Sequence, residues 1–377
     1  MFPVKNNTDQ TEPPEKQGKP RILLAPLDWG LGHATRCIPL IRELLAQGAD
    51  VVLGGSGLSG KLLQAEFPQL PYLEIPSASI RYSRKGFFLP LKILLQTPAF
   101  IRQMKEENRW LRQTVEEWQL DAIISDNRYG LYHPGIPSVL ITHQLAIKTG
   151  LGKTADGLIR RKNYRQLKNF SSCWIPDTAQ EGGLAGELAH PDKKPVIPYR
   201  YIGPLTRFSR STALAEPGRL LILLSGPEPQ RTQLEERILK DLHRCPGLIT
   251  LVRGVDLSAP LLPSTSQIRI YNQLPAAELE KEMQLAEWVI SRTGYTTLMD
   301  IFPLRKKSIL VPTPGQPEQE YLGLYHGVKR HALIIPQEQF QLLTALDEAR
   351  SFPYSFPLAE ANKELPGLVS GFLRSLH

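Results

Sequence analysis

The feature that most constrains the fold is a short apolar run near the end of the chain, which stops at a glycine loop and is followed by a helical stretch. Residues 287–290 (EWVI) predict a buried parallel strand, because a strand covered on both faces is a continuous apolar run. Residues 291–294 (SRTG) break that strand, residues 295–304 predict a helix, and residues 308–312 predict the next strand. A loop rich in proline and glycine follows, then a second helix from about Glu318. This order predicts a parallel sheet with helices on its faces.

The two strand-to-helix loops in this stretch are candidates for a ligand site. Open parallel sheets bind ligands at the carboxyl ends of their strands. Gly294 has no Cβ, so a phosphate can approach its main chain, next to the amides that begin the helix. The carboxylate of Asp300 suits the hydroxyls of a ribose, and Gln319 and Glu320 suit those of a sugar. An ordinary strand–helix–strand unit with a glycine turn fits the same spacing, so the pattern alone leaves both interpretations open.

The same stretch resembles the C-terminal donor-binding region of glycosyltransferase family 28, which includes the N-acetylglucosaminyltransferase that forms lipid II. The matching residues are Arg292-Thr293-Gly294, Asp300, Val311-Pro312 and Gln319-Glu320. The resemblance implies a nucleotide-sugar site, with residues 292–294 at the pyrophosphate, Asp300 on the ribose, and Gln319 and Glu320 on the donor sugar. Asp300 is shorter than the family's usual glutamate, and Glu320 replaces a second glutamine, which leaves the identity of the donor sugar open.

A second strand–glycine loop–helix pattern opens the chain. Residues 21–26 (RILLAP) predict a strand, and residues 37–47 predict a helix with one apolar face. The loop between them holds Gly30, Gly32 and His33, but neither a G-x-G-x-x-G fingerprint nor a G-K-[ST] phosphate loop. The sequence therefore predicts a Rossmann-like first domain that binds its ligand without either of these loops.

His33 is the first candidate catalytic residue. An imidazole titrates near neutral pH, so it can accept a proton or polarise a phosphate, although a lone histidine at a helix start is more often a packing or capping residue. The G-x-G-H loop resembles the acceptor-domain glycine loop of family 28. The longer run GLGHATRC also resembles the opening of the nucleotide-sugar hydrolases of pseudaminic acid biosynthesis. The two resemblances share a substrate class but differ in the nucleophile, which is an acceptor hydroxyl in one and water in the other.

Two further candidates end predicted strands of the same domain. Asp126 ends the strand at residues 121–126, and His143 follows the strand at residues 139–142. Carboxyl ends of parallel strands share one edge of the sheet, so we expect both side chains beside His33, in acceptor binding or proton transfer. Polar residues that merely terminate buried strands fit the pattern about as well.

The remaining donor candidates lie in the second half of the chain. Ser225 and Gly226 follow the strand at residues 220–224, where family 28 has a glycine-rich loop on the donor phosphates. Asn272 follows the strand at residues 267–271, where the family packs main chain against the uracil. Both assignments are implied by the resemblance.

The domain organisation follows from the order of these patterns. We expect a disordered polar tail at residues 1–19, an acceptor domain at 20–203, a donor domain at 204–355, and a terminal helix at 356–377 that packs back on the first domain. The boundary is placed at the Gly203-Pro204-Leu205 segment, which resembles the interdomain segment of many GT-B glycosyltransferases.

Composition and charge limit the cellular compartment and the partners that we expect for the protein. No apolar run of about 18 residues predicts a membrane span, no secretory signal opens the chain, and three isolated cysteines fit a reducing cytosol. The net charge of +8 is concentrated in residues 77–112 and 147–170. Residues 79–104 combine basic and apolar side chains, which suits either a loop and buried helix of the first domain or contact with an anionic membrane. No nucleic-acid motif is present, so we expect no nucleic-acid partner.

Together these patterns predict a GT-B fold, with two Rossmann-like domains whose parallel sheets face each other. The resemblance implies a cytoplasmic glycosyltransferase that moves a hexose or N-acetylhexosamine from a UDP-sugar to an unidentified acceptor. That acceptor is expected to be lipid-linked or part of the cell envelope, with the enzyme at the inner face of the membrane. No cofactor or metal is expected beyond the co-substrate. A UDP-sugar hydrolase or epimerase of the same fold, and a non-catalytic nucleotide-sugar-binding protein, are the alternatives.

Overall fold

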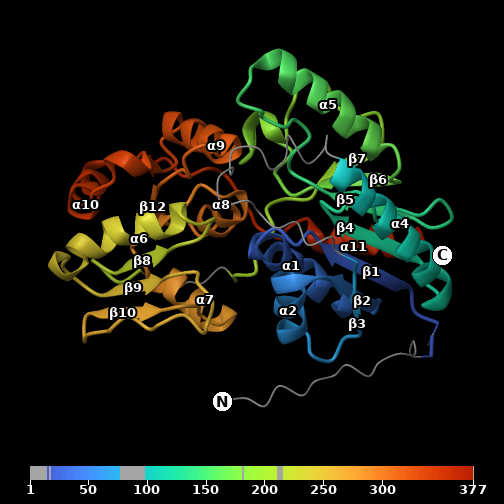
Figure 1. Cartoon of the computed structure of the whole chain (residues 1–377), viewed down its shortest axis with the longest axis horizontal. Helices are drawn as coiled ribbons and strands as arrows, with labels where there is room; N and C mark the ends of the chain where they lie inside the picture. The colour runs from blue at the N-terminus through green and yellow to red at the C-terminus, as the bar shows by residue number, and fades with distance from the viewer. Residues whose placement is uncertain (1–14, 17, 77–97, 181, 210–214, 377) are drawn as a thin grey trace.

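The computed structural model describes residues 15–16, 18–76, 98–180, 182–209 and 215–376. Two parallel β-sheets, each flanked by helices, lie side by side (Figure 1). The helices of the second sheet reach the first domain mainly through α8 and α9, which lie near the middle of the view in Figure 1. The predicted arrangement of two doubly wound α/β units is therefore confirmed.

The first sheet has the strand order β3-β2-β1-β4-β5-β6-β7, and every pairing in it is parallel. Its strands are β1 (Arg21–Pro26), β2 (Asp50–Gly55), β3 (Tyr72–Glu74), β4 (Ala122–Asp126), β5 (Ser138–Ile141), β6 (Ser172–Ile175) and β7 (Tyr199–Tyr201). The connecting helices are α1 (Leu31–Ala46), α2 (Gly57–Glu66), α4 (Pro98–Glu117), α5 (Lys153–Leu167) and the 3-10 turn η1 (Gly186–Leu188). The central strands are apolar and fully buried, as the sequence pattern predicted.

The second sheet has the order β10-β9-β8-β11-β12-β13 and is also parallel throughout. Its strands are β8 (Leu220–Leu223), β9 (Ile249–Val252), β10 (Ile268–Tyr271), β11 (Trp288–Ser291), β12 (Lys307–Leu310) and β13 (Leu333–Ile334). Its helices are α6 (Gln230–Asp241), η2 (Leu242–Arg244), α7 (Ala276–Leu285), α8 (Tyr295–Ile301), α9 (Pro317–Val328), η3 (Gln337–Gln339) and α10 (Leu342–Ser351). Strand order reverses between β8 and β11, which is where such sheets bind ligands.

One apolar core runs from the first domain into the second. The buried residues Tyr295, Leu298 and Phe302 of α8 belong to the same cluster as Ile38 and Leu40 of α1. The two domains are therefore joined by buried apolar contact as well as by the chain. This contact fixes the start of α8 against the start of α1.

The C-terminal helix α11 (Leu365–Arg374) is shorter than predicted. The expected helix over residues 356–377 would have placed Pro366 in its interior, where a proline removes a hydrogen bond and clashes with the preceding turn. In the structure Pro366 lies in the first turn, where proline is tolerated. The helix packs on the first domain, where the Gln47 side chain donates to the Pro366 carbonyl at 2.9 Å and the rings of Phe372 and Trp174 meet edge to face at 5.2 Å.

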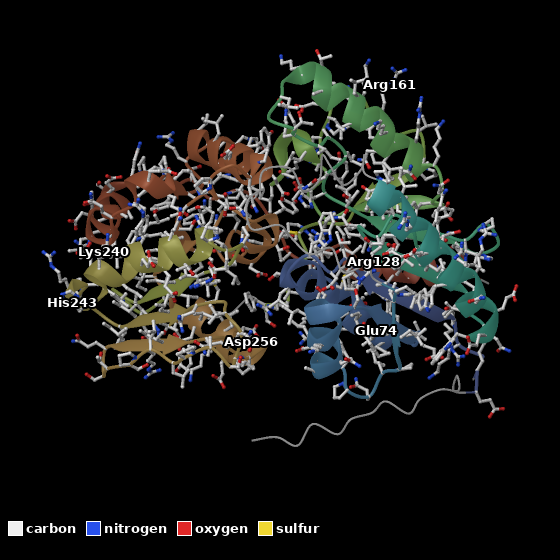
Figure 2. All side chains as sticks on the ribbon, viewed as in Figure 1. Glu74, Arg128, Arg161, Lys240, His243 and Asp256 are labelled. Atoms are coloured by element: carbon white, nitrogen blue, oxygen red, sulfur yellow. The ribbon has the colours of Figure 1, made fainter. Side chains whose placement is uncertain are left out.

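The basic segment at residues 147–170 contains the whole of α5, at the top of Figure 1. Arg161 projects from this helix into solvent (Figure 2). Of the other basic segment, residues 77–112, the structure describes residues 98–112, which belong to α4. Of the basic and apolar stretch at residues 79–104 it therefore describes only residues 98–104. Within the described chain, no helix combines the length and the apolar character that a membrane crossing requires.

Candidate active site

The register of the first sheet brings the predicted catalytic residues together. Strand β4 pairs with β1 so that Asp126 lies level with Pro26, and with β5 so that it lies level with Ile141. His143 follows two residues beyond Ile141, and His33 lies in the first turn of α1, after β1. The helix begins at Leu31, earlier than the predicted residue 37, so His33 is held by a helix instead of a loop.

His33 and Asp126 are in direct contact. The Nδ1 atom of His33 lies 3.1 Å from Oδ1 of Asp126. The Asp126 side chain is fully buried, whereas that of His33 is 17% exposed. Among the described residues, no hydrogen-bond partner reaches the other ring nitrogen, Nε2. The pair therefore combines a buried carboxylate with an imidazole that can present Nε2 to a reactant.

Arg36 completes this cluster from one turn further along α1. Its guanidinium forms a two-pronged ion pair with Asp126, and one of its terminal nitrogens also lies 2.9 Å from Nδ1 of His33. Sequence reasoning did not select Arg36 as a site residue. Its spacing of three from His33 was an available signal, since residues three apart share a helix face.

The charges in this cluster keep His33 neutral and Asp126 ionised. Burial and the charge of Arg36 hold the pKa of His33 below its usual 6.5, although Asp126 acts in the opposite direction. Burial alone would raise the pKa of Asp126, but Arg36 and His33 hold it well below its usual range. At neutral pH the pair is therefore an unprotonated imidazole beside a carboxylate, which is the state required of a general base.

His143 is joined to the second domain. Its Nε2 lies 3.0 Å from Oε1 of Glu318, at the start of α9, and the Gln144 amide donates to the other oxygen of the same carboxylate. The His143 ring stacks on Tyr295 of α8, with centroids 4.1 Å apart. The sequence did not identify Glu318 as a site residue, because only the docking of two domains brings it to His143.

The predicted acceptor loop also contacts the second domain. A Cβ on Gly32 would lie 3.0 Å from Oγ1 of Thr296, whose hydroxyl donates to the Gly32 carbonyl at 3.2 Å. Gly30 has φ of 90°, a conformation that favours glycine, and directly precedes α1. Gly32 is therefore explained by its contact with the second domain, and Gly30 by its positive φ.

Part of the predicted donor site forms one group at the ends of β11 and β12. Thr293 is buried, and its hydroxyl donates to the Gln319 carbonyl at 2.8 Å. The Gln319 side chain accepts from the Thr313 amide, and Glu320 accepts from the Gly315 amide. Gln319 and Glu320 thus hold the loop before α9.

At the start of α8, the part of the protein that a ligand can reach is the main chain of Gly294. A Cβ on Gly294 would meet only Oγ1 of Thr297, at 3.8 Å, so its backbone is accessible to a ligand. Ser225 and Gly226 are exposed at the end of β8, the strand next to β11. The exposed glycine loop after β8 and Gly294 therefore follow neighbouring strands.

The predicted donor residue Arg292 points into the protein. The Arg292 guanidinium is buried and donates to the carbonyls of Val311 and Gln230 and to the Gln337 side chain. Any donor contact at this position is therefore left to the main chain.

The Asn272 amide holds the loop that follows β9. It accepts from Arg253 at 2.9 Å and donates to the Ala259 carbonyl at 2.7 Å. Asn272 also follows β10, two strands away from β8, so the structure does not bring its side chain to the other donor candidates.

Asp300 faces the segment that joins the domains. Its Oδ1 accepts a short hydrogen bond from the Thr206 hydroxyl, and the residue is 9% exposed. Burial raises the pKa of Asp300 to about 6, although Arg207 and Thr206 oppose the shift. The carboxylate is thus engaged within the protein, and its contact with a ribose stays a prediction.

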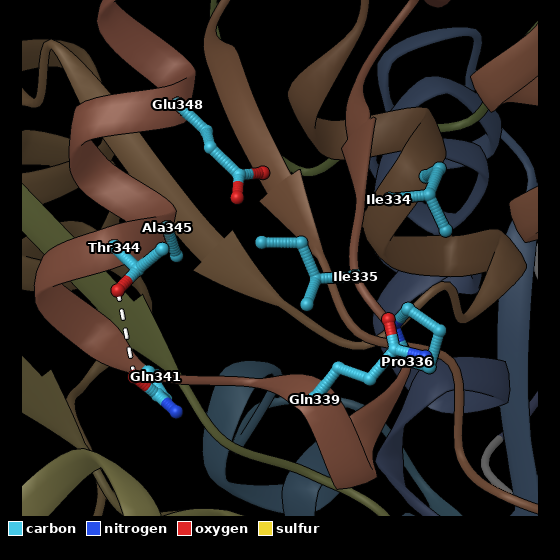
Figure 3. Close-up of a pocket in the computed structure, with 8 residues that line it drawn as sticks. All are labelled: Ile334, Ile335, Pro336, Gln339, Gln341, Thr344, Ala345 and Glu348. Atoms are coloured by element: carbon cyan, nitrogen blue, oxygen red, sulfur yellow. Dashed lines mark hydrogen bonds between the residues drawn. The ribbon is translucent and has the colours of Figure 1, made fainter.

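A shallow hollow on the second domain lies apart from these residues. It is formed by β13, η3 and α10, with Ile335 and Glu348 on its walls (Figure 3). None of the predicted donor residues lines it. Within the described part of the chain, no three His, Cys, Asp or Glu side chains gather in a way that would hold a metal ion.

Comparison with known proteins identifies the fold and the kind of enzyme. Residues 258–367 match the model of the glycosyltransferase family 28 C-terminal domain. An uncharacterized glycosyltransferase of Methanosarcina acetivorans is 24% identical over 307 residues, which cover 77% of this chain and 79% of that protein. The glycotransferase of kitacinnamycin superposes with a TM-score of 0.61 at 17% identity, over 95% of this chain and 96% of that one.

Acinetobacter baumannii MurG superposes with a TM-score of 0.56 at 13% identity, over 95% of this chain and 99% of that one. The chain is a GT-B glycosyltransferase similar to family 28. The matched family region of this glycosyltransferase contains β11, α8 and α9, with Gly294 directly before α8 and Glu318 in α9. A further GT-B structure, spinosyn rhamnosyltransferase SpnG complexed with thymidine diphosphate, superposes with a TM-score of 0.57 at 15% identity, over 94% of this chain and 99% of that one.

Proposed function

We propose that the protein transfers a hexose or N-acetylhexosamine from a UDP-sugar to an acceptor hydroxyl, with His33 as the general base. The observation that carries this proposal is the contact between His33 and the buried Asp126, at the interface of the two domains. The depressed pKa of His33 leaves it unprotonated at neutral pH, and its Nε2 has no partner among the described residues.

In the proposed reaction, Nε2 of His33 removes the proton of the acceptor hydroxyl as the acceptor oxygen bonds to the anomeric carbon of the sugar. The bond from that carbon to the β-phosphate oxygen breaks, and UDP leaves with the electron pair. The imidazolium that forms is stabilised by Asp126, which accepts its Nδ1–H. A general base of this kind contributes a rate factor of about 10² to 10⁴.

The donor side of the proposal rests on the second domain. The region that matches the family model includes the accessible main chain at Gly294. The neighbouring rhamnosyltransferase was complexed with thymidine diphosphate, which supports a nucleoside diphosphate as the leaving group in this fold. The choice of uridine rests on the resemblance to family 28. We propose that the UDP-sugar is the sole co-substrate and that no other cofactor or metal is needed.

The acceptor is proposed to be lipid-linked or part of the cell envelope, reached by peripheral contact of residues 79–104 with the membrane. Most of that segment lies outside the described residues. Water in place of the acceptor hydroxyl would make the same His33 and Asp126 pair a UDP-sugar hydrolase, so the reaction product must be identified directly.

Calorimetric titration tests the donor. Purified protein is titrated with UDP, UDP-N-acetylglucosamine, UDP-glucose, thymidine diphosphate and GDP. Saturable binding of the UDP compounds, lost in Gly294→Trp, is expected because the indole would fill the space beside the Gly294 main chain. Preference for thymidine diphosphate would overturn the assignment of uridine, and no binding to any nucleotide would overturn the function.

The turnover rate of a His33 variant tests whether His33 is the general base. His33→Ala should lower kcat by about 10² to 10⁴ while UDP binding stays within about twofold. The same substitution at the exposed His243 is the matched control and should leave turnover unchanged. Full activity of His33→Ala would remove His33 from the mechanism. Release of free sugar in equal amounts with and without acceptor would identify a hydrolase.

A further inference from the structure

The two histidines of the site are linked through a single guanidinium. Arg36 places one terminal nitrogen 3.3 Å from Nδ1 of His143 and the other 2.9 Å from Nδ1 of His33. An arginine side chain carries hydrogen-bond donors only. The lone pair of an imidazole Nδ1 is therefore the favourable partner for each of these nitrogens, unless a carboxylate competes for the same position.

At Nδ1 of His143 no carboxylate of the described residues competes with Arg36. Nδ1 therefore favours accepting from Arg36, which places the ring proton on Nε2. Nε2 faces Oε1 of Glu318 at 3.0 Å, and a carboxylate can only accept. Both neighbours of His143 therefore demand the same tautomer, in which neither ring nitrogen is available to a substrate.

At His33 a carboxylate does compete. Oδ1 of Asp126 lies 3.1 Å from the same Nδ1 that Arg36 approaches. When the proton is on Nδ1, it is donated to Asp126 and Nε2 becomes a base. When it is on Nε2, Arg36 donates to Nδ1 and His33 cannot accept a proton from a substrate.

Glu318 reaches this network from the second domain, and α9 holds it there. The Tyr321 hydroxyl accepts from the Glu187 amide at 2.7 Å, and the Tyr325 hydroxyl donates to the Gly183 carbonyl at 3.0 Å. His326 forms a third bond, at 2.8 Å, to the Leu184 carbonyl. These contacts place the first turn of α9 against His143, so Glu318 is positioned by the interface itself.

We propose that Glu318 is a positioning residue that fixes the proton of His143 on Nε2, and that this leaves His33 as the one base of the site. This inference rests on the proposed function and deepens it. With its proton on Nε2, His143 donates to Glu318 and accepts from Arg36, so neither of its ring nitrogens can take a proton from a substrate. At His33 the Nδ1 proton has a carboxylate acceptor in Asp126, and Nε2 stays open. Contact between the domains therefore leaves His33 as the base of the first domain.

The tautomers can be measured without any activity assay. Protein labelled with ¹⁵N in its histidines is studied at pH 7.5 by long-range ¹H–¹⁵N correlation, with His33→Gln and His143→Gln used to assign the two rings. We expect the proton of His143 on Nε2 and that of His33 on Nδ1. A proton on Nδ1 of His143, or on Nε2 of His33, would overturn the inference even if the protein is an active transferase.

Kinetics test the role of Glu318. Glu318→Gln keeps an oxygen that can accept from His143, so kcat should stay within about threefold of the wild type. Glu318→Ala leaves only the long 3.3 Å contact with Arg36 to select the tautomer of His143, so both tautomers should appear in the spectrum. We expect kcat to fall by about 10- to 100-fold, with KM for the UDP-sugar within about threefold. Glu348→Ala, on the exposed side of α10, is the matched control.

The outcomes separate the two proposals. If kcat falls equally in Glu318→Gln and Glu318→Ala, then the negative charge of Glu318 matters and not its acceptor oxygen. That result would overturn the inference. Wild-type kcat in Glu318→Ala would overturn it as well. If no UDP-sugar is turned over by the wild type, the proposed function fails, while the spectra still decide the proton positions.

Discussion

Acidification should weaken the fold through a pair of histidines in the second domain. Nδ1 of His326, on α9, lies 2.9 Å from Nδ1 of His331, and both residues are buried. Only one of these atoms can carry the proton that joins them, so a second proton breaks the contact. Burial and the neighbouring His331 lower the pKa of His326 to about 3, although its bond to Leu184 opposes the shift. Burial and Lys329 lower the pKa of His331 to about 4.

The size of the effect follows from these pKa values. In the unfolded chain both imidazoles titrate near 6.5, so below that pH the unfolded state binds protons that the folded state excludes. Their contribution to stability is therefore present above pH 6.5 and is lost as the pH falls towards 4 and 3. Between pH 7 and pH 5 each histidine should cost about 2 kcal/mol, which gives about 4 kcal/mol for the pair.

Urea unfolding at pH 7, 6 and 5, followed by tryptophan fluorescence, measures this loss. The variant with both His326→Gln and His331→Gln will have a lower stability at pH 7, but its unfolding free energy should fall by about 4 kcal/mol less between pH 7 and pH 5. His243→Gln, at an exposed site, is the control, and its curve should run parallel to that of the wild type. Parallel curves for the wild type and the double variant would refute the reasoning.

Two further substitutions test buried contacts between distant segments. Asp300→Asn should stabilise the protein by up to about 3 kcal/mol at pH 8, because burial raises the carboxyl pKa to about 6 and its ionisation above that pH opposes folding. The gain should shrink as the pH falls below 6 in thermal melts, and a gain that does not depend on pH would contradict this account. Gly186→Ala should cost about 1–3 kcal/mol, since Gly186 has φ of 56° and a Cβ there would lie 2.4 Å from the Tyr321 hydroxyl. An unchanged melting temperature would show that the loop adapts.

The sequence predicted the two sheets and the gathering of His33, Asp126 and His143 for a physical reason. Buried parallel strands are continuous apolar runs, and their carboxyl ends must share an edge of the sheet. The loop after β1 and the ends of β4 and β5 follow adjacent strands, so their polar residues meet. The boundaries of α1 and α11 were less predictable, because helix ends depend on local turns and on where a proline can be accommodated.

The rest of the site depends on side-chain direction and on domain docking. Nothing in the local pattern distinguishes an arginine that binds a ligand from one that donates to four carbonyl or amide oxygens inside the protein, as Arg292 does. In the same way, the side chain of Asn272 is engaged in hydrogen bonds with a neighbouring loop. Glu318 meets His143 across 175 positions of sequence, a contact that arises only when α9 packs against the first domain.

The docking of α9 on the loop around η1 has a consequence for engineering by domain exchange. The chain crosses from one sheet to the other near Pro204, which suggests that point as the natural place to join halves of two enzymes. A hybrid cut there would separate Tyr321 and Tyr325 from the tight glycine turns of residues 182–186 that receive them. The unit that can be exchanged is therefore discontinuous in sequence. It consists of the second sheet with its helices together with this short loop from the first domain, and a recombinant that omits the loop would leave α9 misplaced.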